Sequence, residues 1–70
     1  MNFVELSDEE YGKIKDAVVK EVGQTKADDF FYNDLSYLTE GTIILVNGEF
    51  IEAKGFKDQV KTIVDFIKGV

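Results

Sequence analysis

The chain has 70 residues, fourteen acidic against eight basic, with a net charge of −6 at pH 7 and no cysteine, histidine or proline. This length predicts one small domain, residues 1–70, with a modest hydrophobic core. The lack of cysteine excludes disulfides and thiolate metal sites, and the lack of histidine leaves no side chain that ordinarily changes charge between pH 5 and 8. We expect no signal peptide and no membrane span, and therefore a cytoplasmic protein.

The first structural signal is a helix over residues 8–22. Ser7 and Glu10 have the spacing of a capping box, in which each residue satisfies a backbone group of the other. Apolar residues follow at helical spacing: Tyr11, Ile14, Val18 and Val22. Gly23 predicts a left-handed cap at the end of this helix. Residues 2–6, which precede it, fit either an edge strand or an ordered arm.

The pattern of residues 24–41 permits two interpretations. Its apolar residues could line one face of a helix, and these residues are Ala27, Phe31, Leu35 and Leu38. Alternatively, Glu40–Gly41 is a two-residue turn that pairs Tyr37 with Ile44 across two strands. We prefer the turn, because a lone two-stranded hairpin is a poor sheet and a third strand would stabilise it. The result is a predicted antiparallel meander over about residues 35–53.

The strongest hairpin signal is Asn47–Gly48, which lies between two apolar runs and predicts a two-residue turn. The register of such a turn pairs Leu45 with Phe50 and Ile44 with Ile51. One face of the hairpin would carry Ile44, Val46, Ile51 and Ala53, and the other would carry Ile43, Leu45 and Phe50. Because both faces would be apolar, we expect both to be covered, by helices or by another chain.

A second helix is predicted over residues 55–69. Its apolar stripe consists of Phe56, Val60, Ile63, Val64 and Ile67. Gly69 is placed to cap the end of this helix, and Lys68 lies in the last turn, where the helix dipole favours a cation. The predicted fold class is therefore α+β, a small antiparallel β-meander or hairpin flanked by an N-terminal and a C-terminal α-helix.

The sequence offers little catalytic or metal-binding chemistry. The segment from Asp29 to Glu40 has the twelve-residue length of a calcium-binding EF-hand loop. That loop requires a glycine at its sixth position, where Asp34 stands, and an oxygen ligand at its third, where Phe31 stands. There is also no glycine-rich phosphate loop and no arginine. We therefore expect no enzymatic activity, no metal and no cofactor.

The net charge is unevenly distributed along the chain. Residues 1–40 hold ten acidic residues and four lysines, a net charge of −6, whereas residues 41–70 hold four of each and are neutral. This magnitude is ordinary for a small soluble domain, but acids that lysines do not neutralise also suit a protein that copies the negative charge of DNA. Direct binding to nucleic acid would instead need a basic surface. The candidate partner-binding residues are Asp8, Glu9, Asp16, Asp28, Asp29, Tyr32, Asp34 and Glu40.

In its size, acidity, lysine-only basicity and lack of catalytic motifs, the chain resembles small acidic proteins that phages use against host DNA-binding proteins, such as inhibitors of the HU-type nucleoid protein. The resemblance implies a basic DNA-binding protein of a bacterial host as the partner, and competition with DNA as the mechanism. The alternative is a small structural or interaction domain, or a homodimeric regulator, without DNA mimicry. The two hypotheses differ in whether the carboxylates converge on one face.

Overall fold

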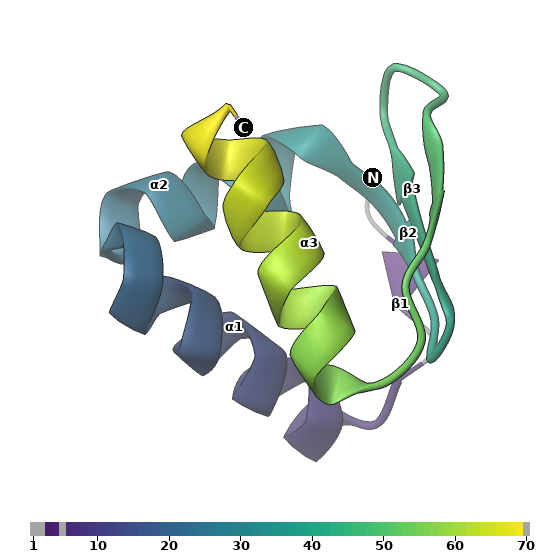
Figure 1. Cartoon of the computed structure of the whole chain (residues 1–70), viewed down its shortest axis with the longest axis horizontal. Helices are drawn as coiled ribbons and strands as arrows, with labels where there is room; N and C mark the ends of the chain where they lie inside the picture. Colours follow the sequence, from purple (N-terminus) through teal and green to yellow (C-terminus); the bar gives the residue numbers. More distant parts are fainter. Residues whose placement is uncertain (1–2, 5, 70) are drawn as a thin grey trace.

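A computed structural model of the chain describes residues 3–4 and 6–69. All the helices lie on one side of a four-stranded sheet (Figure 1). In chain order the elements are β1 (Phe3–Val4), α1 (Asp8–Val22), α2 (Gln24–Asp29), the π-helical turn η1 (Phe30–Asp34), β2 (Leu35–Leu38), β3 (Thr42–Leu45), β4 (Phe50–Glu52) and α3 (Phe56–Lys68). The predicted α+β fold with an antiparallel meander is confirmed.

The sheet has the strand order β1-β2-β3-β4. β2, β3 and β4 form the antiparallel meander, and β1 adds a short parallel strand beside β2. Of the two alternatives for residues 2–6, the structure has the edge strand, at Phe3–Val4, while Asn2 and Glu5 lie outside the described residues. None of the helices in the described part of the chain has the length and apolar character needed to cross a membrane.

The helix α1 begins at the predicted position with Ser7 as its cap, although the Glu10 side chain bonds the Ser7 hydroxyl and not, as predicted, the Ser7 backbone. The Ser7 hydroxyl accepts a hydrogen bond from the Glu10 backbone N–H at 3.2 Å and donates to Glu10 Oε1 at 3.1 Å. At the other end of α1, Gly23 has the expected positive φ of 93°, but its ψ of 160° is extended. The predicted left-handed cap is therefore wrong there, because the chain turns sharply and α2 begins at once. At the end of α3, Gly69 is left-handed as predicted.

Both interpretations of residues 24–41 hold in part. The first part is helical, in α2 and η1, and the predicted strand begins at Leu35. The Glu40–Gly41 turn has the predicted register, with Tyr37 opposite Ile44. The wide turn of η1 directs Phe30 and Phe31 into the core in succession, with their rings edge to face and 5.3 Å apart. A π-helical turn often marks a local irregularity of this kind.

The β3–β4 hairpin has a different register from the predicted one. Its loop contains three residues, 46–48, and is closed by the Leu45 N–H, which donates to the Glu49 carbonyl at 2.9 Å. Gly48 has a φ of 93°, whereas no residue other than glycine has a positive φ in the described ranges. This matches a three-residue hairpin loop that ends on a glycine with positive φ. The predicted two-residue turn is wrong because it also needs a positive φ at Asn47.

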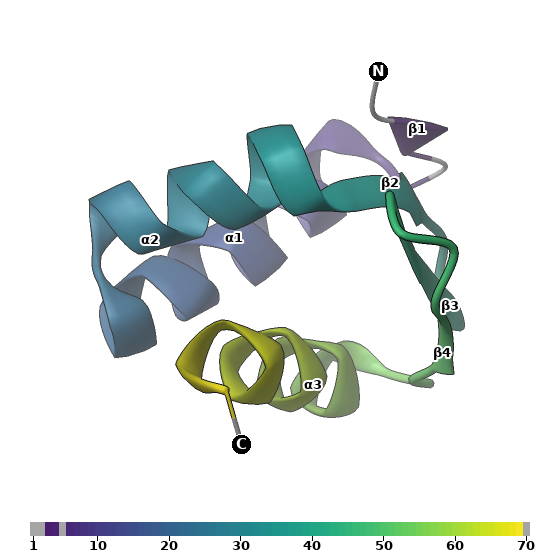
Figure 2. The same ribbon diagram turned by 90° about the horizontal axis from the view of Figure 1, so that it is seen from above.

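The change of register moves Phe50 and Ile51 to the faces opposite to those predicted. Ile43 faces Ile51, and Ile44 faces Phe50. The inner face therefore carries Ile51 against the core, while on the outer face Phe50 is 64% exposed and Val46 61%. Figure 2 shows that the helices all lie on the inner side. The expectation that both faces are covered thus fails within the chain itself, because no described helix covers the outer face.

Candidate functional site

The structure places the eight predicted partner-binding residues in two groups and at one isolated position. Asp8 and Glu9 lie in the first turn of α1, and Glu40 lies in the β2–β3 turn. Figure 1 shows that α1 and α3 begin, and that β2 and β3 are joined, at the same end of the molecule. We call Asp8, Glu9, Glu10 and Glu40 the acidic end.

The remaining predicted residues do not join the acidic end. Four of them lie within α2 and η1, and we call them the α2 group: Asp28, Asp29, Tyr32 and Asp34. Asp16 is exposed in the middle of α1. The predicted carboxylates therefore form two separate groups and one isolated charge, so they do not converge on the single face expected of a DNA mimic, and any mimicry rests on the acidic end alone.

The acidic end carries exposed charge that the chain itself hardly neutralises. The first turn of α1 is a favourable place for Asp8, Glu9 and Glu10, because the positive end of the helix dipole lies there. Glu9 pairs with Lys13 at 3.5 Å, but both side chains are largely exposed, so this pair is weak. Asp8, Glu10 and Glu40 form no ion pair within 4 Å with any residue that the structure describes.

The α2 group is partly neutralised by a lysine of α1. Lys15 Nζ lies 3.1 Å from Asp28 Oδ1 and 3.2 Å from the Tyr32 hydroxyl oxygen, and 4.7 Å from the centre of the Tyr32 ring. The hydrogen bond with Tyr32, and then that with Asp28, raises the pKa of Lys15. The hydrogen bond from Lys15 holds the pKa of Asp28 below its ordinary value. The prediction that no lysine neutralises these acids is therefore wrong for Asp28.

The other carboxylates of the α2 group are also engaged or partly covered. The Asn33 amide donates to Asp29 Oδ1 at 2.7 Å, although Asp29 remains exposed. Asp34 is half-buried, and its backbone carbonyl accepts a hydrogen bond from the Val46 N–H at 2.9 Å. Tyr32 is 64% exposed. The acidic end is consequently the stronger candidate for a surface that attracts a cation.

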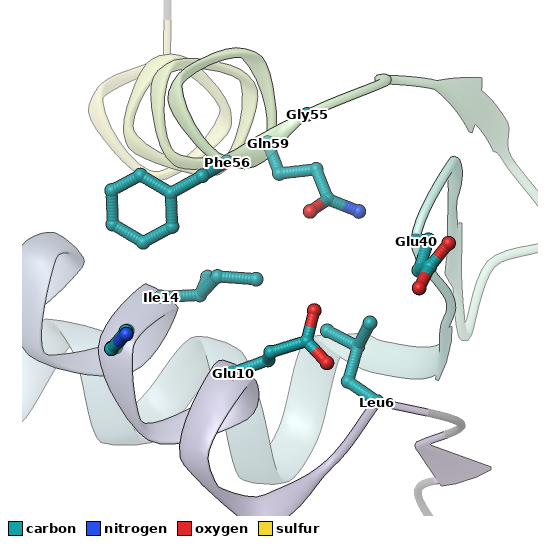
Figure 3. A pocket seen from close by; sticks show the side chains of 8 residues that line it. Leu6, Glu10, Ile14, Glu40, Gly55, Phe56 and Gln59 are labelled. Atoms are coloured by element: carbon teal, nitrogen blue, oxygen red, sulfur yellow. The ribbon is translucent and has the colours of Figure 1, made fainter.

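A pocket of about 520 Å³ opens beside the acidic end (Figure 3). It is lined by Leu6, Glu10, Lys13, Ile14, Glu40, Gly55, Phe56 and Gln59. Three segments supply these walls: the start of α1, the β2–β3 turn and the start of α3. Figure 3 shows the Glu10 carboxylate directed into the pocket and Glu40 at its edge. Its volume falls within the roughly 300–1,000 Å³ of sites that bind small molecules or side chains of that size.

The most deeply placed polar group of this pocket is Gln59, which is 3% exposed. Its amide nitrogen donates a hydrogen bond to the Thr39 carbonyl oxygen, which ties α3 to the turn that carries Glu40. The amide oxygen is left as the accepting atom and is turned into the pocket (Figure 3). Sequence reasoning missed Gln59, although its position three residues after Phe56 and four before Ile63 places it on the apolar face of the helix.

The described residues contain no group of three or more Asp, Glu, His or Cys side chains that could hold a metal ion. Asp29 and Glu40, the two ends of the segment compared with a calcium loop, lie in α2 and in the β2–β3 turn, with β2 between them.

The chain matches no model of a known protein family, and no curated protein and no solved structure is significantly similar to it. A function for this chain therefore rests on the geometry of the acidic end and its pocket.

Proposed function

We propose that the chain is an acidic protein-binding module that acts as a DNA mimic. It occupies the DNA-binding surface of a basic, nucleoid-type bacterial protein and so inhibits the binding of that protein to DNA, in the bacterial cytoplasm. The observation that carries this proposal is the acidic end, where Asp8, Glu10 and Glu40 have no ion-pair partner among the described residues. The net charge of −6 acts in the same direction.

The physical reason is the way in which basic proteins hold DNA. Their lysines and arginines neutralise phosphates and release condensed counterions, so a surface with projecting carboxylates competes for the same groups. The field of an acidic protein also accelerates the encounter with a basic partner, and salt weakens this steering. Asp29 and the exposed ring of Tyr32 add a second, less charged contact region, since Lys15 neutralises part of it.

A DNA competition assay tests the proposal. An HU-type nucleoid protein is bound to a fluorescent DNA duplex, and the chain is added while the anisotropy is measured at about 50 mM and about 200 mM salt. We expect the chain to release DNA at the lower salt concentration and to be much less effective at the higher one. If the duplex stays bound at the lower concentration, the proposal is wrong.

Matched variants locate the competing surface. Asp8→Asn combined with Glu40→Gln removes two charges from the acidic end, and Glu49→Gln combined with Glu52→Gln removes two from the β3–β4 hairpin. The first pair should require several times more protein for half-displacement, whereas the second pair should compete almost as well as the unmodified chain. Equal losses in both would mean that total charge matters and the acidic end does not.

A separate observation favours a second candidate, a small interaction domain or homodimeric regulator without DNA mimicry. The outer face of the sheet exposes Val46 and Phe50 beside the half-buried Ile44. A two-fold dimer would bury the same apolar patch on both copies. Sedimentation equilibrium of the chain and of Phe50→Ser tests this candidate: a dimer that the substitution abolishes would support it, and monomers throughout would exclude it.

A further inference from the structure

We propose that the pocket beside the acidic end receives an arginine side chain of the basic partner. This inference rests on the proposed function and names the group that the site recognises. The pocket combines hydrogen-bond acceptors, from Glu10, Glu40 and Gln59, with apolar walls from Leu6, Ile14 and Phe56. This is the combination that a guanidinium group on an aliphatic stem would fill.

The acceptors are available for a ligand. Glu10 uses Oε1 for the Ser7 hydroxyl at 3.1 Å, which leaves its second carboxylate oxygen for the pocket. Glu40 forms no ion pair within the described part of the chain. Gln59 is 97% buried, and because its amide nitrogen is bonded to the Thr39 carbonyl, its oxygen faces the pocket as an acceptor. Since no buried side-chain polar atom lacks a partner among the described residues, this oxygen is open to the pocket and can accept from a ligand.

The chemistry of these acceptors favours a guanidinium over other groups. Carboxylates and an amide oxygen accept hydrogen bonds and donate none at neutral pH. A guanidinium has five N–H donors in one plane and matches carboxylates in bidentate geometry. An ammonium has the same charge but only three donors on a single strongly hydrated atom. A lysine side chain would therefore bind in the same place, but more weakly.

Two positive features of the pocket must be weighed against this cation. The start of α3 at Gly55 has no side-chain cap and contributes about half a positive charge. Lys13 also lines the pocket and adds one positive charge, which its weak, exposed pair with Glu9 at 3.5 Å offsets only in part. Glu10 and Glu40 contribute two full negative charges, so the balance still favours a cation over an anion.

The apolar walls suit the rest of an arginine side chain. Leu6 and Ile14 face Phe56 across the pocket (Figure 3). Methylene groups of long cationic side chains pack on apolar surface while the charged head reaches polar groups. Phe56 is 47% exposed, so its ring is open to a planar guanidinium, which stacks on aromatic faces.

Binding of a small probe tests the pocket directly. N-acetyl-arginine amide is titrated into the ¹⁵N-labelled chain, with N-acetyl-lysine amide and the neutral N-acetyl-citrulline amide as comparisons. We expect saturable shifts at the Gln59 side-chain amide and the Phe56 backbone amide, strongest for arginine, weaker for lysine and absent for citrulline. Equal shifts with citrulline, or arginine shifts spread evenly over all exposed acids without saturation, would overturn the inference.

Substitutions complete the test. Glu40→Gln keeps the shape of the side chain and should weaken the binding of the arginine probe about fivefold. That change in affinity is a modest share of what a charge-assisted hydrogen bond contributes. Glu49→Gln removes the same charge from an exposed position beside the hairpin loop and should leave probe binding unchanged. If both variants bind the probe as the unmodified chain does, the pocket is not a guanidinium site.

The inference and the proposed function can fail separately. If the chain displaces DNA from the nucleoid protein and Glu40→Gln does so equally well, the function stands and the pocket inference is overturned. If the arginine probe binds in the pocket but the chain leaves DNA on the nucleoid protein, the guanidinium site stands and the proposed partner is wrong.

Discussion

The two faces of β4 predict very different costs for shortening two adjacent side chains. Ile51 packs against the core from the inner face, whereas Phe50 is 64% exposed on the outer face. Truncation of a buried isoleucine to alanine costs about 2–5 kcal/mol, so Ile51→Ala, at a partly buried site, should cost about 2 kcal/mol. Full burial of a phenylalanine is worth about 1.5–3 kcal/mol, and with roughly a third of the residue covered Phe50→Ala should cost about 0.5–1 kcal/mol.

Urea denaturation followed by circular dichroism measures both costs. A domain of this size should unfold with about 4–10 kcal/mol, so a loss of 2 kcal/mol is readily resolved. The measurement is made at low protein concentration, so that association through the outer face does not contribute. The reverse order, with Phe50→Ala the more destabilising, would refute the three-residue loop, because a two-residue turn places Phe50 on the same face as Ile43.

Three further changes test other parts of the structure. Gly48→Ala should destabilise by about 1 kcal/mol because its φ of 93° strains any other residue. Gly12→Ala should stabilise α1 by up to about 1 kcal/mol, since its new Cβ would meet no atom within 4 Å. Urea denaturation measures both changes in the free energy of unfolding. A stabilising Gly48→Ala or a destabilising Gly12→Ala would contradict the corresponding prediction. Lys15→Gln should raise the pKa of Asp28 toward its ordinary value in an NMR titration. Because the pKa of Asp28 is lower in the folded chain than in the unfolded chain, the ionised carboxylate stabilises the fold. This stabilisation is complete at pH values above the unfolded-state pKa and is lost as the pH falls through the folded-state pKa.

The sequence predicts the strands well where pairing and turn chemistry agree. The Glu40–Gly41 turn was predictable because it places Tyr37 opposite Ile44. The register of the next hairpin was not predictable, because Asn47–Gly48 fits both a two-residue turn and a three-residue loop. The φ of Asn47 is positive in the first and negative in the second. One residue of shift is enough to exchange the faces of every following side chain.

The candidate site was predictable in composition but not in arrangement. The sequence shows that the acids outnumber the lysines before Gly41, but it cannot show that α2 folds back on α1 and brings Lys15 against Asp28. The pocket likewise depends on three segments that are far apart in the chain. Gln59 joins the site only because α3 packs beside the β2–β3 turn, and no local pattern reports such a contact.

The most direct test of an acidic DNA mimic is a chemical-shift map of the ¹⁵N-labelled chain with an unlabelled HU-type nucleoid protein. We predict shifts at the first turn of α1, at Glu40 and at Phe56, and we predict that an added DNA duplex reverses them. Shifts confined to Ile44, Val46 and Phe50, or shifts that persist when DNA is added, would contradict DNA mimicry and support the outer face of the sheet as the binding surface.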